Sequence, residues 1–274
     1  MCDIERRIQE KITKQGIPLG EWNISINYGV KTGFNDAFII DTACRDRLVA
    51  EDPKSDEIIR PILRGRDIRR YGFRFADLWL IVSHNGVKEA GIPRVDIDDY
   101  PAVKRHLDQY FDKLKKRTDK GDTPYNLRNC AYMDDFSKQK IVWGEISDVP
   151  KFAIDLEGRF VAEATTFLMV GEHLKYLLCF LNSELSEYFF AKYGTTTGMG
   201  TLRWKKYLVE LLPVPCVDPQ KEQQICEELD VLLNIEQDKQ ANQIEKINAL
   251  IYDIFGFTND EVRFIKQSIE LGAH

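Results

Sequence analysis

Apolar and polar positions alternate along this chain with two different periods, which predict both helices and strands. In residues 3–15 (DIERRIQEKITKQ), Ile4, Ile8 and Ile12 recur at four-residue spacing. This spacing predicts a short amphipathic helix. Gly16 and Pro18 follow it and are expected to end it.

Short segments rich in β-branched and aromatic residues come next, separated by turn residues, and predict strands. Longer segments with apolar residues on one face or on most sides predict helices at about 101–116 and 174–192. The first 217 residues are therefore expected to form one α+β domain with a mixed or barrel-like sheet and packed helices. The expected strands are 22–28, 37–40, 78–83, 141–146, 152–155 and 160–170.

The last 57 residues have a different pattern. Asp218 and Pro219 form a helix start, with Asp as the N-cap and Pro in the first helical position. Apolar residues then recur every three or four positions up to residue 254, interrupted by a polar stretch at 236–243. This pattern predicts a long helix of the partial coiled-coil type, which Gly256 ends. A capping box at 258–261 predicts a last short helix, so residues 218–274 are expected to form a helical spacer or arm.

Charge divides the chain in the same place. The formal net charge is −6, but residues 218–274 hold 12 acids and 5 bases, whereas the first 217 residues are nearly balanced. Three stretches are basic: 58–75, 104–120 and 192–206. An acidic chain has no general attraction for a polyanion, so DNA binding would require a local basic surface.

The stretch 58–75 has six arginines, no lysine and one acid. Arginine suits bidentate contacts with phosphate or with a guanine edge, which favours nucleic-acid contact for some of these side chains. Solvated surface charges and internal ion pairs are the alternative. Trp143, Trp204 and Tyr71 are expected in the core rather than stacked on bases.

Several function classes lack their signatures. The six cysteines form no CxxC pair, and the four histidines are widely separated, so no metal site is expected. GxSxG, Walker A and HExxH motifs are absent, so we expect no catalytic residues. No apolar run approaches the length of a membrane span, and no secretory leader is recognisable, which predicts a soluble cytoplasmic protein.

A series of short motifs, in a fixed order, resembles the TaqI-like C-terminal specificity domain. This is the target-recognition domain of type IIG restriction-modification enzymes and related adenine-specific DNA methyltransferases. The resemblance runs from about residue 20 to 217 and rests on order and spacing. Its motifs are 29–41 (GVKTGFNDAFIID), 59–71 (IRPILRGRDIRRY), 140–143 (KIVW), 164–167 (ATTF), 181–183 (LNS), 197–204 (TGMGTLRW) and 212–215 (LPVP).

The resemblance implies a domain that reads a short double-stranded DNA sequence and directs adenine methylation, and in some members cleavage, by other domains of a parent protein. Neither the NPPY-type adenine pocket nor the FxGxG-type cofactor loop of such methyltransferases occurs here. S-adenosylmethionine and Mg²⁺ are therefore expected only in methyltransferase or nuclease domains outside this chain, which itself needs no cofactor. A fragment and a stand-alone specificity subunit both remain open, as do the target sequence and the oligomeric state.

Candidate DNA-binding residues come from the basic stretches and from two glycine-rich loops, at 29–35 and 195–200, whose backbone can approach DNA closely. For each loop, a tight turn without a ligand is the alternative. The candidates are Lys31, Thr32, Arg64, Arg66, Arg69, Arg70, Arg74, Lys115, Lys116, Arg117, Lys120, Thr196, Thr197, Arg203, Lys205 and Lys206.

Three other functions stay open. One is a protein-interaction scaffold whose acidic arm binds a partner. Another is the specificity region of a phage-exclusion methyltransferase, which carries a similar domain. The last is a small hydrolase, which would need a catalytic pair that the sequence does not reveal. Steep weakening of binding by salt would distinguish DNA recognition from a scaffold.

Overall fold

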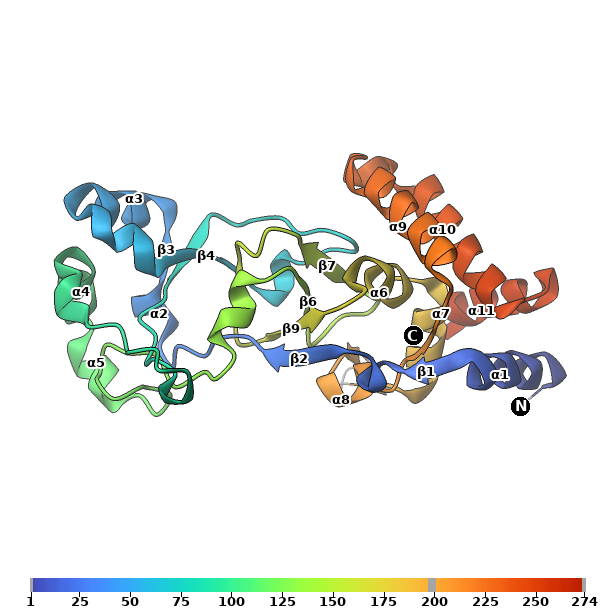
Figure 1. Ribbon diagram of the computed structural model, residues 1–274, viewed down its shortest axis with the longest axis horizontal. Coiled ribbons are helices and arrows are strands. Elements are labelled where there is room, and N and C mark those ends of the chain that lie inside the picture. Colours follow the sequence, from blue (N-terminus) through green and yellow to red (C-terminus); the bar gives the residue numbers. More distant parts are fainter. Residues whose placement is uncertain (1, 197–200, 273–274) are drawn as a thin grey trace.

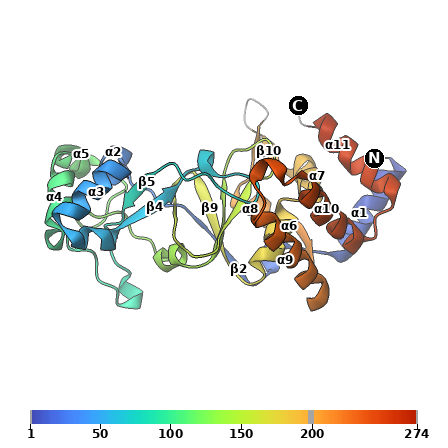
Figure 2. The same cartoon turned by 90° about the horizontal axis from the view of Figure 1, so that it is seen from above.

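The computed structural model describes residues 2–196 and 201–272. It is elongated, with helices at both ends and a sheet between them (Figure 1). Figure 2 shows the same order from above, with β4 and β5 between the helices at one end and strand β9. The helices are α1 (Asp3–Gln15), α2 (Asn35–Phe38), α3 (Thr42–Glu51), α4 (Pro101–Asp108), α5 (Phe111–Lys116), α6 (Leu174–Leu181), α7 (Glu184–Tyr193), α8 (Lys206–Val209), α9 (Pro219–Leu233), α10 (Ala241–Phe255) and α11 (Asn259–Gly272).

The strands form two four-stranded sheets and two short pairs. One sheet has the order β2-β9-β6-β7 and is antiparallel, and the other has the order β3-β5-β4-β8 with β4 and β8 parallel. None of the sheets in the described part of the chain closes into a barrel. The strands are β1 (Gly16–Pro18), β2 (Ile24–Tyr28), β3 (Ile39–Asp41), β4 (Ile59–Leu63), β5 (Leu78–Ile81), β6 (Lys140–Gly144), β7 (Phe152–Asp155), β8 (Val161–Ala162), β9 (Thr166–Gly171), β10 (Thr195–Thr196), β11 (Leu202–Arg203) and β12 (Pro213–Pro215).

The β2-β9-β6-β7 sheet separates two hydrophobic cores. Side chains alternate between the faces of a strand, so Ile141 and Trp143 enter one core and Val142 enters the other. Phe167 and Leu168 on β9 divide in the same way. Both faces are therefore buried along β6, β7 and β9, which explains why these strand sequences read as almost continuous apolar runs, whereas the edge strand β2 is partly exposed.

The first core lies between this sheet and the helices α1, α6, α7 and α9–α11. Trp143, Trp204 and Tyr71 are each 1% exposed within it, which confirms their prediction as core residues. The second core holds β3, β4, β5 and β8 together with helices α3 and α4. The α+β fold class is thus confirmed.

The C-terminal residues differ from the single long helix expected there. Asp218 does cap α9, with Oδ1 accepting from Lys221 N at 3.0 Å. The polar stretch at 236–243, however, covers most of the connection between α9 and α10 and the first turn of α10, and the two helices pair as a hairpin. The prediction of one long helix was wrong. The polar stretch has no apolar stripe, so little packing energy is lost when the chain leaves the helical conformation there. The resulting turn lets α9 and α10 pack on each other.

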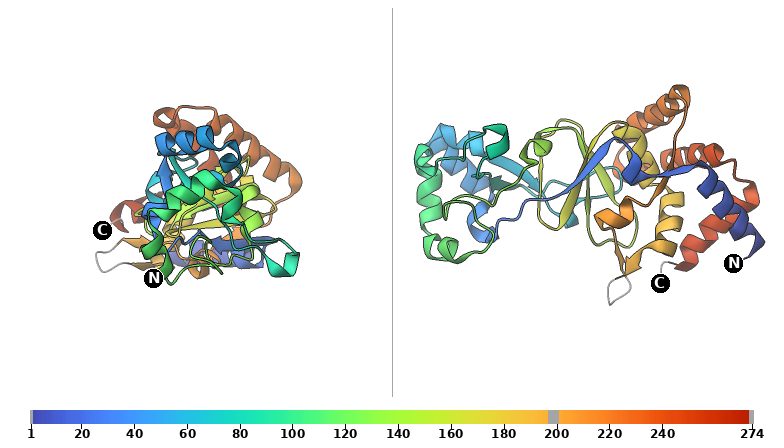
Figure 3. Two further views of the ribbon diagram at one scale, coloured as in Figure 1. Left: turned by 90° about the vertical axis from the view of Figure 1, so that its left-hand side faces the viewer. Right: turned by 60° about the horizontal axis from the view of Figure 1, so that its bottom comes forward.

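The hairpin and α11 pack against the preceding part of the chain. α9 contacts α6, while α10 and α11 contact α7. Figure 3 shows α1, in blue, beside α11, in red, where Lys11 Nζ lies 2.7 Å from Glu261 Oε2. The boundary at residue 217 stays a prediction, but Ile225, Leu229 and Ile251 share one core with residues on the N-terminal side of it.

Candidate nucleic-acid interface

The chain's loops meet at one end of the β2-β9-β6-β7 sheet. Tyr28 and Trp143 both pair with Phe167, so β2 and β6 end at the same level, on either side of the start of β9. Neighbouring strands lie about 4.8 Å apart, which places the segments after Tyr28 and after Trp143 about 10 Å from each other. Each of these segments lines a cavity.

The larger cavity, which we call the Arg66 groove, has a volume of about 450 Å³. Two of its walls are the 3₁₀ turn Gly65–Asp67 after β4 and the loop after β6. These walls touch through glycines, because a Cβ on Gly144 would lie 3.1 Å from the Cα of Gly65. The lining residues are Gly65, Arg66, Ile68, Arg69, Gly144, Glu145, Ile146, Ser147, Lys151 and Thr165.

Backbone hydrogen bonds fix the loop after β6. Glu145 N donates to Thr165 O at 3.1 Å, and Trp204 N donates to Glu145 O at 2.7 Å. Ser147 N donates to Leu202 O at 3.2 Å, and the buried Trp204 indole donates to Ser147 O at 3.0 Å. The groove is therefore built on a rigid framework that carries three cations, Arg66, Arg69 and Lys151, and one carboxylate, Glu145.

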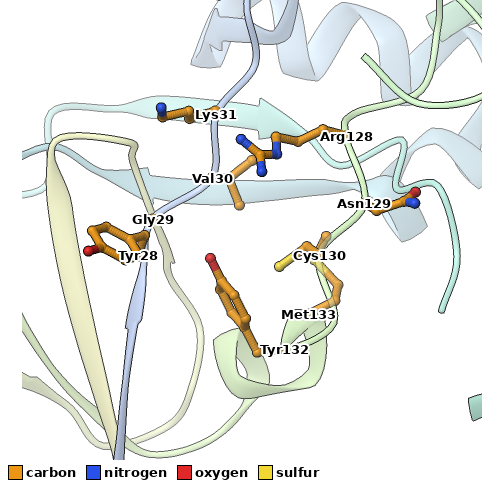
Figure 4. Close-up of a pocket in the computed structure, with 9 residues that line it drawn as sticks. All are labelled: Tyr28, Gly29, Val30, Lys31, Arg128, Asn129, Cys130, Tyr132 and Met133. Carbon is orange, nitrogen blue, oxygen red and sulfur yellow. The ribbon is translucent and has the colours of Figure 1, made fainter. Parts of the chain in front are cut away.

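The smaller cavity, which we call the Tyr28 pocket, lies on the other side of β9 and has a volume of about 220 Å³. Figure 4 shows the Arg128 guanidinium and the Tyr132 hydroxyl pointing into it, while Lys31 extends away from them. Burial raises the pKa of Tyr132 to about 12, so its hydroxyl stays protonated at neutral pH. Its lining is Tyr28, Gly29, Val30, Lys31, Arg128, Asn129, Cys130, Tyr132 and Met133.

Three of the arginines predicted to bind DNA have intramolecular partners. Arg64 forms a bidentate ion pair with Asp67, with nitrogen to oxygen distances of 2.8 and 2.9 Å. Arg70 Nε donates to Asn182 O at 2.9 Å, and Arg69 Nη1 donates to Arg66 O at 2.7 Å. Burial alone would raise the pKa of Asp67, but hydrogen bonds from Arg64 and its backbone hold that pKa below its ordinary value.

Arg66 and Arg74 differ from these three. Both side chains are exposed, and the described part of the structure gives neither guanidinium a hydrogen bond or an ion pair. The two residues lie on one short hairpin, in which Ile68 pairs with Phe73 and Arg74 N donates to Asp67 O at 2.8 Å. The Arg64–Asp67 pair thus holds a turn from which Arg66 and Arg74 are presented to solvent.

The basic stretch before residue 121 holds one buried cation. Arg117 is 7% exposed, and its guanidinium donates to the carbonyls of Thr32, Asp119, Pro124 and Asn126. Burial lowers the pKa of Arg117 to about 10, which still leaves the side chain charged at neutral pH. Arg117 therefore stabilises the loop and is inaccessible to DNA, contrary to its prediction as a phosphate contact.

Its lysine neighbours remain at the surface. Lys115 Nζ lies 3.1 Å from Asp112 Oδ1, and Lys120 Nζ donates to Lys115 O at 2.6 Å. Lys116 is exposed, and its side chain has no hydrogen bond or ion pair among the described residues. This lysine surface borders the Tyr28 pocket, since Arg128 on the pocket wall lies 3.2 Å from Asp119.

The first glycine-rich loop packs on the protein itself. Thr32 is buried, and its hydroxyl donates to Asn35 Oδ1 at 2.5 Å. A Cβ on Gly29 would come within 2.0 Å of the carbonyl oxygen of Glu163, so glycine is required there for strand packing. Thr32 and Gly29 thus pack within the protein, and their approach to DNA stays a prediction, whereas Lys31 is exposed.

The second loop and its flanks lie beside the Arg66 groove. Thr196 is exposed on β10, which pairs with β11, while Thr197 lies outside the described residues. Arg203 Nη1 lies 3.6 Å from Glu145 Oε1 in the groove. Lys206 Nζ donates to Ile26 O at 2.8 Å, whereas the Lys205 side chain has no hydrogen bond or ion pair within the described ranges.

Among the lining residues that the sequence does not predict as site residues are two cations, Lys151 and Arg128, and the apolar Ile146. Lys151 and Arg128 are single cations outside the basic stretches. Ile146 was placed at the end of a predicted strand, but β6 ends at Gly144. Glycine at 144 followed by polar residues was the available signal that the strand ends there.

Comparison with known proteins identifies the fold. The family model of the TaqI-like C-terminal specificity domain matches residues 60–214, which is more than half of the chain. The chain belongs to this family. The matched region contains the Gly65–Asp67 turn, the loop after β6 and strand β11, so the specificity domain includes every wall of the Arg66 groove. No curated protein matches the chain.

Two solved structures share the fold of this specificity domain. The type IIL restriction-modification enzyme MmeI, solved in complex with DNA, matches with a TM-score of 0.67, 12% identity, 94% of this chain and 37% of that chain. The type IIG restriction endonuclease BpuSI matches with a TM-score of 0.60, 15% identity, 98% of this chain and 32% of that chain. The chain thus spans about a third of each of these enzymes.

Family membership confirms the predicted function as a DNA target-recognition domain, and a protein-interaction scaffold is not favoured. The matched family is a recognition domain rather than a catalytic one. In the described residues, no helix is both long and apolar enough to cross a bilayer.

Proposed function

We propose that this specificity domain binds double-stranded DNA at the Arg66 groove and thereby directs a methyltransferase of its parent protein to a short sequence. One observation carries the proposal. Arg66, whose guanidinium has no hydrogen bond or ion pair in the described structure, lies in a cavity whose other walls come from residues 144–151 and from Thr165. Arginine with a free planar guanidinium is suited to guanine O6 and N7 or to a phosphate.

The cations divide into two sets by position. Arg66, Lys151 and Arg203 are in or beside the groove, where the rigid framework supports selective contacts with bases. Lys31, Lys116 and Arg128 are near the Tyr28 pocket and are suited to phosphate contacts, which position the duplex without reading it. Both cavities are at the same end of the sheet, so one duplex laid across that end would contact both sets.

The groove is smaller than the cross-section of a duplex, so it would hold a base edge and its sugar-phosphate backbone rather than enclose the DNA. The second wall of a DNA cleft would then come from the catalytic domain of the parent. In this proposal the parent methylates adenine with S-adenosylmethionine and, if it also cleaves DNA, uses Mg²⁺ in a nuclease domain. This chain supplies only recognition.

Selection from a randomised duplex pool tests the proposal. The chain is incubated with the pool at roughly 50 mM and roughly 200 mM salt, and the retained DNA is sequenced. We expect one short motif to be enriched, with weaker retention at the higher salt because each phosphate contact releases counterions. No enrichment at either salt would contradict DNA recognition by this chain.

Two double variants locate the surface. Arg66→Ala with Lys151→Ala removes groove cations and is expected to abolish enrichment. Arg263→Ala with Lys239→Ala removes one cation of α11 and one of the connection between α9 and α10, whose side chains are 69% and 67% exposed, and is expected to bind as the wild type does. An equal loss of enrichment in both double variants would show that binding depends only on the total charge of the chain.

A further inference from the structure

Ile146 is an exposed apolar residue on the wall of a cationic groove. The residue is 57% exposed, and among the large hydrophobic residues exposed in the described chain only Leu271 is more exposed. Single exposed apolar residues are common on proteins and by themselves indicate nothing. The position of Ile146 distinguishes it, because Arg66, Arg69 and Lys151 line the same groove.

The backbone at Ile146 is held on both sides. Residue 146 forms an antiparallel bridge with Arg203, and its neighbours Glu145 and Ser147 are hydrogen-bonded to Trp204 and Leu202. Paired residues of an antiparallel bridge project to the same side, so the Ile146 and Arg203 side chains leave the surface together. The isoleucine is therefore presented in a fixed place beside a cation.

A duplex offers one apolar group to such a side chain in its major groove, the C5-methyl of thymine. The flanking cations would contact phosphates and guanine edges, and the Ile146 side chain beside them would face the edge of a base pair. We propose that Ile146 is a specificity-determining residue that contacts a thymine methyl group. The proposal rests on DNA binding at the Arg66 groove and deepens it.

Exchange of thymine for uracil in the selected duplex tests this contact, because uracil lacks only the methyl group. Each thymine of the motif is replaced in turn, and binding is measured for the wild type, Ile146→Ala and Val231→Ala. Val231 is the matched control, since it is 50% exposed and lies on α9, away from the groove. Thermal unfolding verifies that all three proteins are folded.

We expect one position at which uracil weakens wild-type binding about three- to fivefold, the effect of losing one buried methyl contact. At that position Ile146→Ala should bind the thymine and uracil duplexes equally, and Val231→Ala should behave as the wild type. This coupling between one side chain and one methyl group identifies the contact.

Other outcomes overturn the proposal. If uracil weakens both the wild type and Ile146→Ala equally at every position, or if the motif contains no thymine, Ile146 reads no methyl group. If Ile146→Ala weakens binding to thymine and uracil duplexes by the same factor, the side chain acts as a wedge or a packing contact. In these cases binding at the groove still stands, whereas failure of the wild type to bind any duplex would overturn the proposed function as well.

Discussion

The stretches 58–75 and 104–120 both carry a net positive charge but differ in what their cations contact. In the first, Arg64 and Asp67 form an ion pair that fixes a turn, and Arg66 projects from that turn into solvent. In the second, Arg117 is the buried cation, and the lysines remain partly or fully at the surface. A run of positive charge therefore does not say which of its members are available to a ligand.

The difference follows from the backbone around each arginine. Loops carry carbonyl groups that no helix or sheet satisfies, and a guanidinium with five N–H donors can satisfy several of them at once. Arg117 does this for four carbonyls. Among the described residues no such set of carbonyls surrounds the exposed Arg66, so its N–H donors face solvent.

The largest effect is expected when Arg117 is replaced. Arg117→Met should lower the free energy of unfolding by about 2 to 4 kcal/mol, because buried carbonyls lose their donors. Urea denaturation of the variant and of Lys116→Ala measures this, and the lysine variant should stay within about 0.5 kcal/mol of the wild type. Unchanged stability with lost DNA binding in Arg117→Met would show instead that this arginine contacts the ligand.

Replacement of Arg66 should give the opposite result. Arg66→Ala is expected to weaken binding to the selected duplex by about 1 to 3 kcal/mol, the range for one arginine contact with a base, and to leave the urea midpoint unchanged. A filter-binding or fluorescence titration measures the affinity, with Arg263→Ala as the control. A destabilised Arg66→Ala would mean that this side chain has a structural role like that of Arg117.

Removal of the charge on Asp67 should act through the turn that carries Arg66. At neutral pH, Asp67→Asn should cost about 1 to 2 kcal/mol in the free energy of unfolding, because Arg64 loses a charged acceptor. The folded-state pKa of Asp67 is lowered, so its contribution is present above the unfolded value of about 4 and is lost as the pH falls below it. Urea denaturation between about pH 3 and pH 7 should show the two proteins converging in acid, and a constant difference would contradict this assignment.

The smallest effect is expected for Lys116. Lys116→Ala should reduce the magnitude of the slope of log affinity against log salt concentration by about 0.9. The affinity for the selected duplex and for a scrambled duplex should fall by the same factor. Titrations at several salt concentrations measure it. If the loss of affinity were confined to the selected duplex, Lys116 would contact a base. The stretch 104–120 would then no longer differ from 58–75 in how its cations are used.

Much of the fold follows from local pattern. The isoleucine spacing predicted α1 correctly, and Asp218 and Thr258 cap α9 and α11 as expected, with Thr258 N donating to Glu261 Oε2 at 2.7 Å. The expected helix at 174–192 is divided into α6 and α7, because Asn182 and Ser183 turn their side chains to the backbone. Such breaks depend on tertiary hydrogen bonds that periodicity does not contain.

The candidate site was less accessible to prediction. Sequence motifs indicated the segments that meet at the groove, but accessibility within each segment depends on partners far along the chain. Arg70 contacts the carbonyl of Asn182, 112 residues away. Lys140 begins β6 yet is fully buried, with Nζ 2.6 Å from Asp155 Oδ2, and nothing in the sequence marked it as an internal charge.

Amide hydrogen exchange with and without the selected duplex would locate the DNA directly. Slower exchange is expected in 65–69, 144–151 and 202–205, the segments of the Arg66 groove and its flank, with weaker protection in 115–120 and none in α9 or α10. Protection confined to the acidic α9–α10 hairpin, or absent from the groove while the duplex is bound, would contradict recognition at this end of the sheet.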